Sequence, residues 1–529
     1  MLLSARDLNA TLWAAADDMR KQMNADVYKD YLLGLVFYKA LSDKMLVDAY
    51  DLIHGGKPAS LDDAQKAYEE VQSDADTWGD LQAELTDRFG CAIQPDKTFS
   101  AFYKQINERT FMLDNLSQAF RDIESASGGV YAGLFDDFDI HSKDLGTTPD
   151  KRNAMLSDVI SKLADIDFNL YQEDALGDAY EYLISQFASE SGKKAGEFYT
   201  PQAVSHLIAR IVTFGQDQKF GFSVYDPTCG SGSLLLQIRN YLSNAGNQGN
   251  IDIKSTVEFF GQELKNQTYN LARMNMMLHR VPGNHQHLRN GDTLDADWPT
   301  DEPTNFDAVV MNPPYSQKYS AAAGLLTDPR FAPFKKLPPA SKADFAFLLH
   351  GYYHLKESGT MGIVLPHGVL FRGAAEGTIR EELLKKGAIY AVIGLPAGIF
   401  FSTGIPTCVI ILKKDNPDRS VLFIDASKEF RKERAKNFLD QEHIDKIFNT
   451  YIERKDIDKY AHLATMEEIE SNGYNLNIPR YVDSSEPEEE IDLNATFAKL
   501  KKLEQEEKEV DAKLAVFFKE LGLNFDEVR

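Results

Sequence analysis

The pattern of hydrophobic and polar positions divides the chain into three parts. In residues 1–165, apolar residues recur at spacings of three and four, as at Leu32 and Leu35, which predicts a helical domain. Residues 166–483 alternate short apolar runs with helical patterns, and this alternation predicts an α/β domain with a wound, mostly parallel sheet. Residues 484–529 are expected to form an acidic linker and a C-terminal helix.

Short apolar runs in the middle part are expected to be strands, because turn residues bound them. Helical patterns separate them, notably at 203–214 and 233–241. The expected strands are residues 222–225, 257–263, 307–311, 361–365, 390–393, 407–412 and 421–424.

The C-terminal helix has a heptad-like apolar spacing that Glu507 interrupts. Such a stripe either packs on the chain itself or meets a partner helix, as in a coiled coil, and the spacing favours neither interpretation. The apolar positions are Leu500, Leu503, Val510, Leu514, Phe517 and Leu521.

Composition indicates a large cytosolic enzyme. At 529 residues, about two to four domains are expected. Cys91, Cys229 and Cys408 are isolated, which suits a reducing compartment. The start has no basic and long apolar leader run, and no apolar run of about eighteen residues occurs. A cytoplasmic location without membrane contact is therefore expected.

The strand expected at 307–311 ends in Asn312-Pro313-Pro314-Tyr315. Two prolines in a row cannot extend a ladder, so the strand must stop there, and each proline restricts the backbone around it. The result is a stiff loop that holds an amide, carbonyl groups and an aromatic ring in set directions. This arrangement suits a planar base with an exocyclic amino group. The structural alternative is a rigid turn in which Tyr315 is a packing residue.

A glycine-rich turn, Asp226–Gly232, lies between an expected strand and an expected helix. Its sequence is Asp-Pro-Thr-Cys-Gly-Ser-Gly, and the three elements make a first βα unit. Gly230 and Gly232 let a backbone approach a ligand closely, although tight βα turns often need glycine anyway. Leu235 stands where a dinucleotide fingerprint has its third glycine, which argues against NAD or FAD.

Further candidates precede and follow this turn. Glu263 ends an expected strand, where an acid suits two ribose hydroxyls, and Asp292 follows a third strand. The structural alternatives are a helix N-cap and a turn aspartate. An N-cap and a first-turn proline explain Thr200-Pro201 at the start of the helix at 203–214.

In combination, these motifs resemble the amino-group methyltransferases that use S-adenosylmethionine. Residues 173–414 resemble the methylation subunit of type I restriction-modification systems. Gly196–Pro201 is similar to a cofactor-contacting segment that precedes the glycine turn in one class of adenine-N6 methyltransferases, and Tyr474–Tyr481 to a segment near the end of their catalytic region. The resemblance implies an S-adenosylmethionine-dependent methyltransferase fold with a helical N-terminal domain and a helical tail.

The same resemblance implies a role for each candidate residue. The Asn312 side-chain oxygen and the Pro313 carbonyl would accept the N6 hydrogens of a flipped-out adenine. Tyr315 would stack on the base, and Phe400 or Phe401 would cover its other face, with core packing as the alternative for both. No metal site is expected. The implied cofactor contacts are Phe198, Thr200, Asp226, Thr228, Gly230, Ser231, Gly232, Glu263 and Asp292.

Other methyl transfers can be weighed by the residues they need. A cytosine-C5 enzyme needs a cysteine nucleophile, commonly in a Pro-Cys pair, which this chain lacks. Methylation of cytosine N4 in DNA or of glutamine in a protein uses the same kind of loop and stays an alternative. The chain has no Gly-x-x-x-x-Gly-Lys-Ser/Thr loop, so ATP-driven translocation would belong to another chain.

The net charge of −24, with 81 acidic against 57 basic residues, is unusual for a DNA enzyme. Because duplex DNA is polyanionic, we expect this chain to bind it poorly by itself. The resemblance implies that a specificity subunit reads the sequence, and that a second copy of this chain and a nuclease–translocase subunit join it on double-stranded DNA. The mixed basic run at 428–436 is expected to be a solvated helix face.

Overall fold

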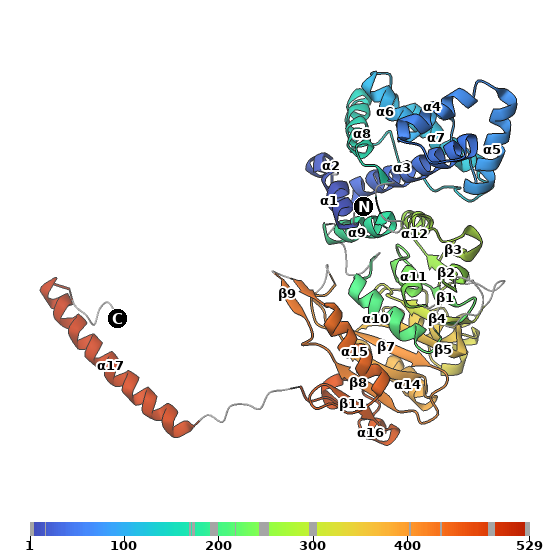
Figure 1. Ribbon diagram of the computed structural model, residues 1–529. Coiled ribbons are helices and arrows are strands. Elements are labelled where there is room, and N and C mark those ends of the chain that lie inside the picture. The colour runs from blue at the N-terminus through green and yellow to red at the C-terminus, as the bar shows by residue number, and fades with distance from the viewer. Residues whose placement is uncertain are drawn as a thin grey trace. The chain divides into compact units, whose positions relative to one another are not determined.

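The computed structural model describes most of the chain (Figure 1). The chain forms two compact units, residues 1–483 and 484–529. The described residues are 5–15, 17–168, 171, 175–190, 199–216, 218–242, 253–295, 304–400, 404–433, 436–484 and 492–523.

The N-terminal part of the first unit is helical, as the sequence pattern predicts. Its helices are α1 (Ala5–Ala15), α2 (Asp17–Gln22), α3 (Ala25–His54), α4 (Leu61–Val71), α5 (Ala75–Phe89), α6 (Phe99–Asn107), α7 (Leu113–Ala126), α8 (Pro149–Ala164) and α9 (Ala175–Glu190). They share one apolar core, in which Leu32 and Leu35 of α3 are fully buried. α9 lies beyond the expected boundary at residue 165, yet it packs on α1 and α3 in this same core.

A nine-stranded sheet follows, with the strand order β11-β8-β6-β7-β5-β4-β1-β2-β3. β7 is antiparallel to β5 and β6, β11 is antiparallel to β8, and the other neighbours are parallel. The mostly parallel α/β fold is therefore confirmed. The strands are β1 (Ser223–Asp226), β2 (Glu258–Glu263), β3 (Gln286–Asn290), β4 (Phe306–Met311), β5 (Leu355–Pro366), β6 (Ile389–Gly394), β7 (Thr407–Lys413), β8 (Val421–Asp425) and β11 (Ala461–Ala464).

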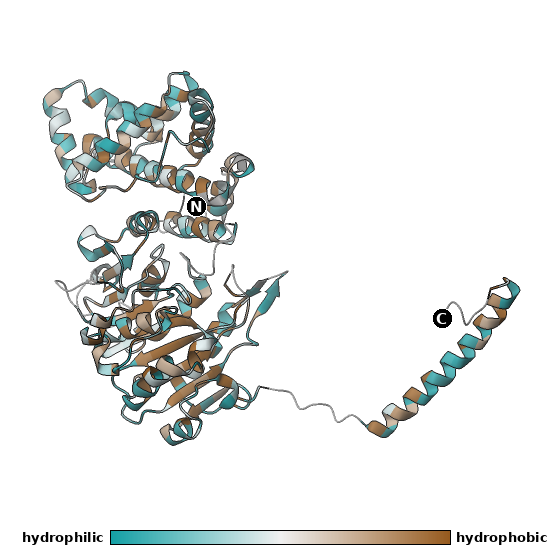
Figure 2. Ribbon diagram, turned by 180° about the vertical axis from the view of Figure 1, so that it is seen from behind, coloured by the Kyte–Doolittle hydropathy of each residue, from teal (hydrophilic) through white to brown (hydrophobic). Residues whose placement is uncertain are grey.

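Helices cover both faces of this sheet and enclose an apolar core on each side. One face carries α10 (Gln202–Thr213), α11 (Ser233–Gln237), α12 (Asn266–Leu278) and α15 (Gln441–Glu453). The other carries α13 (Asp344–Tyr353), α14 (Ala374–Lys385) and α16 (Met466–Ser471). Figure 2 shows the sheet between them as predominantly hydrophobic. Strands buried on both faces explain the continuous apolar runs of the sequence.

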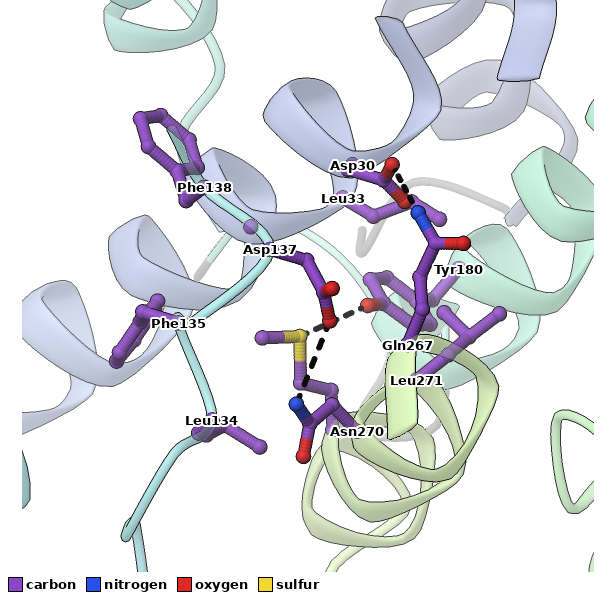
Figure 3. A pocket seen from close by; sticks show the side chains of 12 residues that line it. Asp30, Leu33, Leu134, Phe135, Asp137, Phe138, Tyr180, Gln267, Asn270 and Leu271 are labelled. Atoms are coloured by element: carbon purple, nitrogen blue, oxygen red, sulfur yellow. Dashed lines mark hydrogen bonds between the residues drawn. The ribbon is translucent and has the colours of Figure 1, made fainter. Parts of the chain in front are cut away.

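The helical part meets the sheet part at α12, across a small cleft (Figure 3). The Gln267 amide donates a hydrogen bond to the Asp30 carboxylate. The Asn270 amide donates to the Gly133 carbonyl at 2.7 Å and to Asp137 Oδ2 at 3.4 Å. Burial raises the pKa of both carboxyl groups, Asp30 and Asp137. Polar side chains of α12 thus tie the helical part to the sheet.

The second unit contains the expected C-terminal helix, α17 (Leu493–Glu520). Its N-cap Asp492 accepts a hydrogen bond from Ala495 N at 3.0 Å. The six apolar positions of the predicted stripe are between 39% exposed, at Leu514, and 74% exposed, at Leu521. No residue of α17 is buried. Within its own unit the stripe is therefore not covered, and packing on the chain itself and packing on a partner helix both stay predictions.

The described part of the basic run at 428–436 contains two short strands, so the expected helix face is wrong. β9 (Arg431–Glu433) pairs antiparallel with β10 (Lys436–Phe438), and Arg431 lies opposite Phe438. The run has no apolar stripe for a helix to bury. The Arg431 side chain reaches beyond β10, where its Nε donates a hydrogen bond to Asp440 Oδ2 at 2.8 Å.

Candidate functional site

The carboxyl ends of the central strands bring the expected site residues together. β1 lies between β2 and β4 and runs parallel to both. Asp226 ends β1, Glu263 ends β2, and Asn312 directly follows β4. Ligands of wound α/β sheets bind at such an edge. A cavity there is lined by Tyr199, Thr200, Asp226, Thr228, Cys229, Gly230, Ser231, Ser233, Leu234 and Asn312.

The glycine-rich turn is fixed by backbone hydrogen bonds. Cys229 N donates to Gln262 O at 2.9 Å, and Gly232 N donates to Cys229 O at 2.8 Å. Gly232 has φ +79°, a conformation that side chains disfavour. A Cβ at this position would lie 3.3 Å from Met276 Cε of α12. Glycine at 232 is therefore favoured by the backbone conformation, and a larger side chain there would also have to displace Met276.

The two acids at the strand ends, buried Asp226 and half-buried Glu263, hold the turn. Asp226 Oδ1 accepts a hydrogen bond from Thr228 N at 2.9 Å, and burial raises the pKa of Asp226 to about 8. Glu263 Oε2 accepts from Gly230 N at 3.2 Å, and Oε1 from Lys265 N at 2.9 Å. Burial raises the pKa of Glu263 as well. Since Lys265 is the N-cap of α12, the alternative of Glu263 as the helix N-cap is wrong.

Asp292 has the geometry of a turn aspartate, which is the structural alternative to a cofactor contact. Its Oδ1 accepts from Leu294 N at 2.9 Å. The same turn is held from inside by Arg330, which is 2% exposed. Arg330 Nη1 donates to the Thr293 carbonyl at 2.8 Å and Nη2 to the Asp295 carbonyl at 3.2 Å. A contact between Asp292 and adenine stays a prediction.

Both ends of the Asn312 amide have partners in the site. Nδ2 donates to Thr200 Oγ1 at 3.2 Å, and Oδ1 accepts from the Tyr315 hydroxyl at 2.8 Å. The expected N-cap role of Thr200 is wrong, because Pro201 is the N-cap of α10 and no side chain caps it. The Thr200 hydroxyl instead contacts the loop that follows β4, the expected catalytic loop. The segment before the glycine turn and the loop after β4 are thus joined through one amide.

Tyr315 is held by its surroundings as well as by Asn312. Its ring meets the edge of Phe400, with the centroids 6.3 Å apart and the planes at 79°. Burial raises the pKa of the Tyr315 hydroxyl, so it stays a donor at neutral pH. Phe400 is itself buried, which agrees with a role in core packing as the alternative to covering the base. Phe198 and Phe401 lie outside the described residues.

A buried carboxylate that the sequence analysis missed supports this loop. Asp344, at the start of α13, is fully buried and accepts from Ser316 N at 2.7 Å. Ser316 follows Tyr315 and has φ +54°, which a serine rarely adopts. Arg372 pairs with Asp344 and with Glu376. An acid in a helical first turn is common, so no sequence signal marked Asp344.

Comparison with known proteins identifies the family. Residues 171–490 match the family model of N-6 DNA methylases, and residues 8–163 match that of the HsdM N-terminal domain. The MpnII methylase subunit, from a type I restriction enzyme of Mycoplasma pneumoniae, is 32% identical across 98% of this chain and 96% of its own. The chain is a type I methylase subunit. The resemblance seen in the sequence is confirmed.

Other members of this type I methylase family agree in sequence and in structure. The MjaVII methylase subunit of Methanocaldococcus jannaschii is 30% identical over 90% of this chain and 79% of its own. The crystal structure of the type I methyltransferase subunit from Streptococcus thermophilus is 56% identical, with a TM-score of 0.87. It covers 91% of this chain and 100% of its own. Among the described residues, no helix is long and apolar enough to cross a membrane.

Proposed function

We propose that this type I methylase subunit transfers a methyl group from S-adenosylmethionine to N6 of an adenine flipped out of double-stranded DNA. The position of Asn312 carries the proposal. Its amide lies at the end of β4, in the wall of the cavity that the glycine-rich turn lines. A hydrogen-bond acceptor and a cofactor-type turn that share one cavity suit methyl transfer to an amino group.

Asn312 overcomes the weak nucleophilicity of the target. The adenine amino lone pair is delocalised into the ring, so both N6 hydrogens must be held to localise it. Asn312 Oδ1 and the Pro313 carbonyl accept these hydrogens. Oδ1 already accepts from the Tyr315 hydroxyl, but a carbonyl oxygen has two lone pairs, and one remains for the base. Positioning and electrostatics then supply the rate without a covalent enzyme intermediate.

The acids of the site fit a cofactor with an ammonium group and a ribose. A cation beside Asp226 would offset the burial that raises its pKa. Glu263, which already orders Gly230, has lone pairs left for ribose hydroxyls, and Asp292 would contact the adenine of the cofactor. S-adenosylmethionine supplies an electrophilic methyl group on its sulfonium. Thr200, Thr228, Ser231 and Phe198 complete the proposed contacts.

Sequence readout is assigned to a separate specificity subunit. The net charge of −24 disfavours binding to duplex DNA by this chain alone. A second copy of the chain and a nuclease–translocase would complete the assembly. The helical N-terminal part and the apolar stripe of α17 are the proposed contacts. Such a stripe buries its apolar side chains against a partner helix.

The decisive experiment is purification with the specificity subunit, followed by mapping of the methylated base. N6-methyladenine at one sequence is expected, with little site-specific methylation by this chain alone at physiological salt. Detection of N4-methylcytosine would show that cytosine is the substrate in place of adenine. Detection of methylated glutamine would show that the substrate is a protein. Efficient site-specific methylation without the second subunit would refute the division of labour.

A further inference from the structure

The β9–β10 hairpin stands at the same edge of the sheet as the catalytic loop. β5 and β6 are both antiparallel to β7, so they run in the same direction, and β8 is parallel to β6. Gly394, the last residue of β6, lies in register with Asp425, the last residue of β8. The hairpin follows β8 and extends beyond the sheet (Figure 1). A large ligand such as DNA, bound at the edge of the sheet that carries the catalytic loop, could therefore also contact the hairpin.

The hairpin is also joined to the catalytic loop by a chain of contacts. Asn437 of β10 donates from Nδ2 to the Ala397 carbonyl at 2.6 Å and from N to the Gly398 carbonyl at 3.4 Å. This loop after β6 carries Phe400, whose ring contacts Tyr315. The position of the hairpin is therefore set relative to the site at which the base would be held.

The charge balance of residues 428–436 is opposite to that of the chain as a whole. Between residues 428 and 436 there are five basic residues and two acidic ones, whereas the chain as a whole has 81 acidic against 57 basic residues. Lys428, Arg431 and Lys432 are exposed. Arg431 pairs with Asp440 and Glu433 and so fixes the ladder. An exposed two-stranded ribbon adds little stability by itself, and its cations suit a polyanion.

We propose that the β9–β10 hairpin and the turn that precedes it contact the phosphate backbone of duplex DNA beside the flipped adenine, through Lys432 of β9 and Lys428 of the turn. The proposal rests on the proposed function, because it takes DNA as the substrate. The two lysines would give a local DNA contact to a chain whose net negative charge opposes DNA binding. Phosphate contacts position a duplex without reading its sequence, which agrees with a specificity subunit that reads the bases.

The test compares two double charge reversals in the full chain assembled with its specificity subunit. The first is Lys428→Glu with Lys432→Glu. The control is Lys386→Glu with Lys455→Glu, which makes the same change in net charge at the opposite edge. Lys386 is exposed and precedes β6, and exposed Lys455 follows Arg454, which donates to the carbonyl of Tyr390 in β6.

Binding of a fluorescent duplex that carries the methylated site is measured by anisotropy at several salt concentrations. The hairpin variant is expected to lose at least about tenfold in affinity, and its slope of log K against log salt is expected to become less steep by about two, one for each lost phosphate contact. The control should keep the wild-type slope. Equal affinity and slope for the hairpin variant and the control would overturn the proposal.

Two further measurements separate the possible failures. Calorimetry with S-adenosylmethionine should give wild-type affinity for the hairpin variant, which shows that its site is folded. Loss of the specificity subunit from the hairpin variant on gel filtration would make the hairpin a protein contact and refute the DNA assignment. A wild-type complex that binds DNA with the expected difference between the variants, yet methylates no adenine, would refute the proposed function and leave the hairpin contact supported.

Discussion

Tyr315 offers a test that separates two roles of one side chain. Its hydroxyl donates to Asn312 Oδ1 at 2.8 Å, and its ring would stack on the flipped base. Tyr315→Phe removes the hydroxyl and keeps the ring and its edge contact with Phe400. Tyr315→Ala removes both. The pair of variants therefore measures the orientation of the Asn312 amide and the stacking of the base separately.

The magnitudes follow from the two interactions. A hydrogen bond between neutral side chains contributes a net of about 0.5–1.5 kcal/mol, so Tyr315→Phe should lower the transfer rate by about two- to thirteenfold. Stacking of a base on an aromatic ring contributes about 1–3 kcal/mol. Tyr315→Ala should therefore cost a further factor of about five to 150. Neither variant should change cofactor affinity appreciably, since Tyr315 does not line the cavity beneath the glycine turn.

The assay is single-turnover methyl transfer by the assembled complex at saturating cofactor and DNA. Calorimetry with S-adenosylmethionine and thermal unfolding serve as controls for folding. If Tyr315→Ala is no slower than Tyr315→Phe, the ring does not stack on the base. If Tyr315→Phe transfers as fast as the wild type, the hydroxyl does not orient Asn312 for the reaction.

Further changes test the remaining assignments. Asn312→Ala should abolish transfer in a single-turnover assay while calorimetry still detects cofactor binding, and transfer within about tenfold of wild type, some 1.4 kcal/mol, would exclude the assigned role. Gly232→Val and Glu263→Ala should both lower the affinity for S-adenosylmethionine. Unchanged affinity in folded variants would show that the cofactor binds elsewhere. Because burial raises the pKa of Asp226 to about 8 and only its ionised form attracts an ammonium group, cofactor affinity should rise up to about tenfold per pH unit from pH 6 towards 8. Asp226→Asn should flatten that calorimetric pH profile. Deletion of residues 493–529 should weaken assembly on gel filtration without loss of cofactor binding.

The sequence predicted the parts of the fold that depend on local chemistry. Prolines after Asn312 end β4 at the expected position, and glycines after Asp226 turn the chain into α11. Strand ends could be placed because a buried strand and a turn residue are both visible in a single sequence. The three loops that carry the expected site residues then met at one edge, since parallel neighbouring strands have their carboxyl ends at the same edge of the sheet.

Contacts between distant segments were not predictable in the same way. Thr200 precedes a helix and fits an N-cap by sequence, yet its hydroxyl bonds to Asn312, which lies 112 residues further on. Asp344 supports Ser316 from another element. The run at 428–436 has the composition of a solvated helix face, and only its partner strand and Asp440 make it a hairpin. In each case a tertiary partner decides between local alternatives.

The proposed cofactor site and the helical part both contact the same helix, α12. This helix begins three residues after Glu263, and Asn275 within it donates to the Ser231 carbonyl of the glycine turn at 2.9 Å. On another side, Gln267 and Asn270 bond to the helical part (Figure 3). Because packed helices shift as rigid bodies rather than deform, a displacement of the helical part would move α12 and disturb the turn that we propose binds the cofactor. The helical part is thus a support of the transfer site, and partners that bind it could act on methylation without contacting the cofactor.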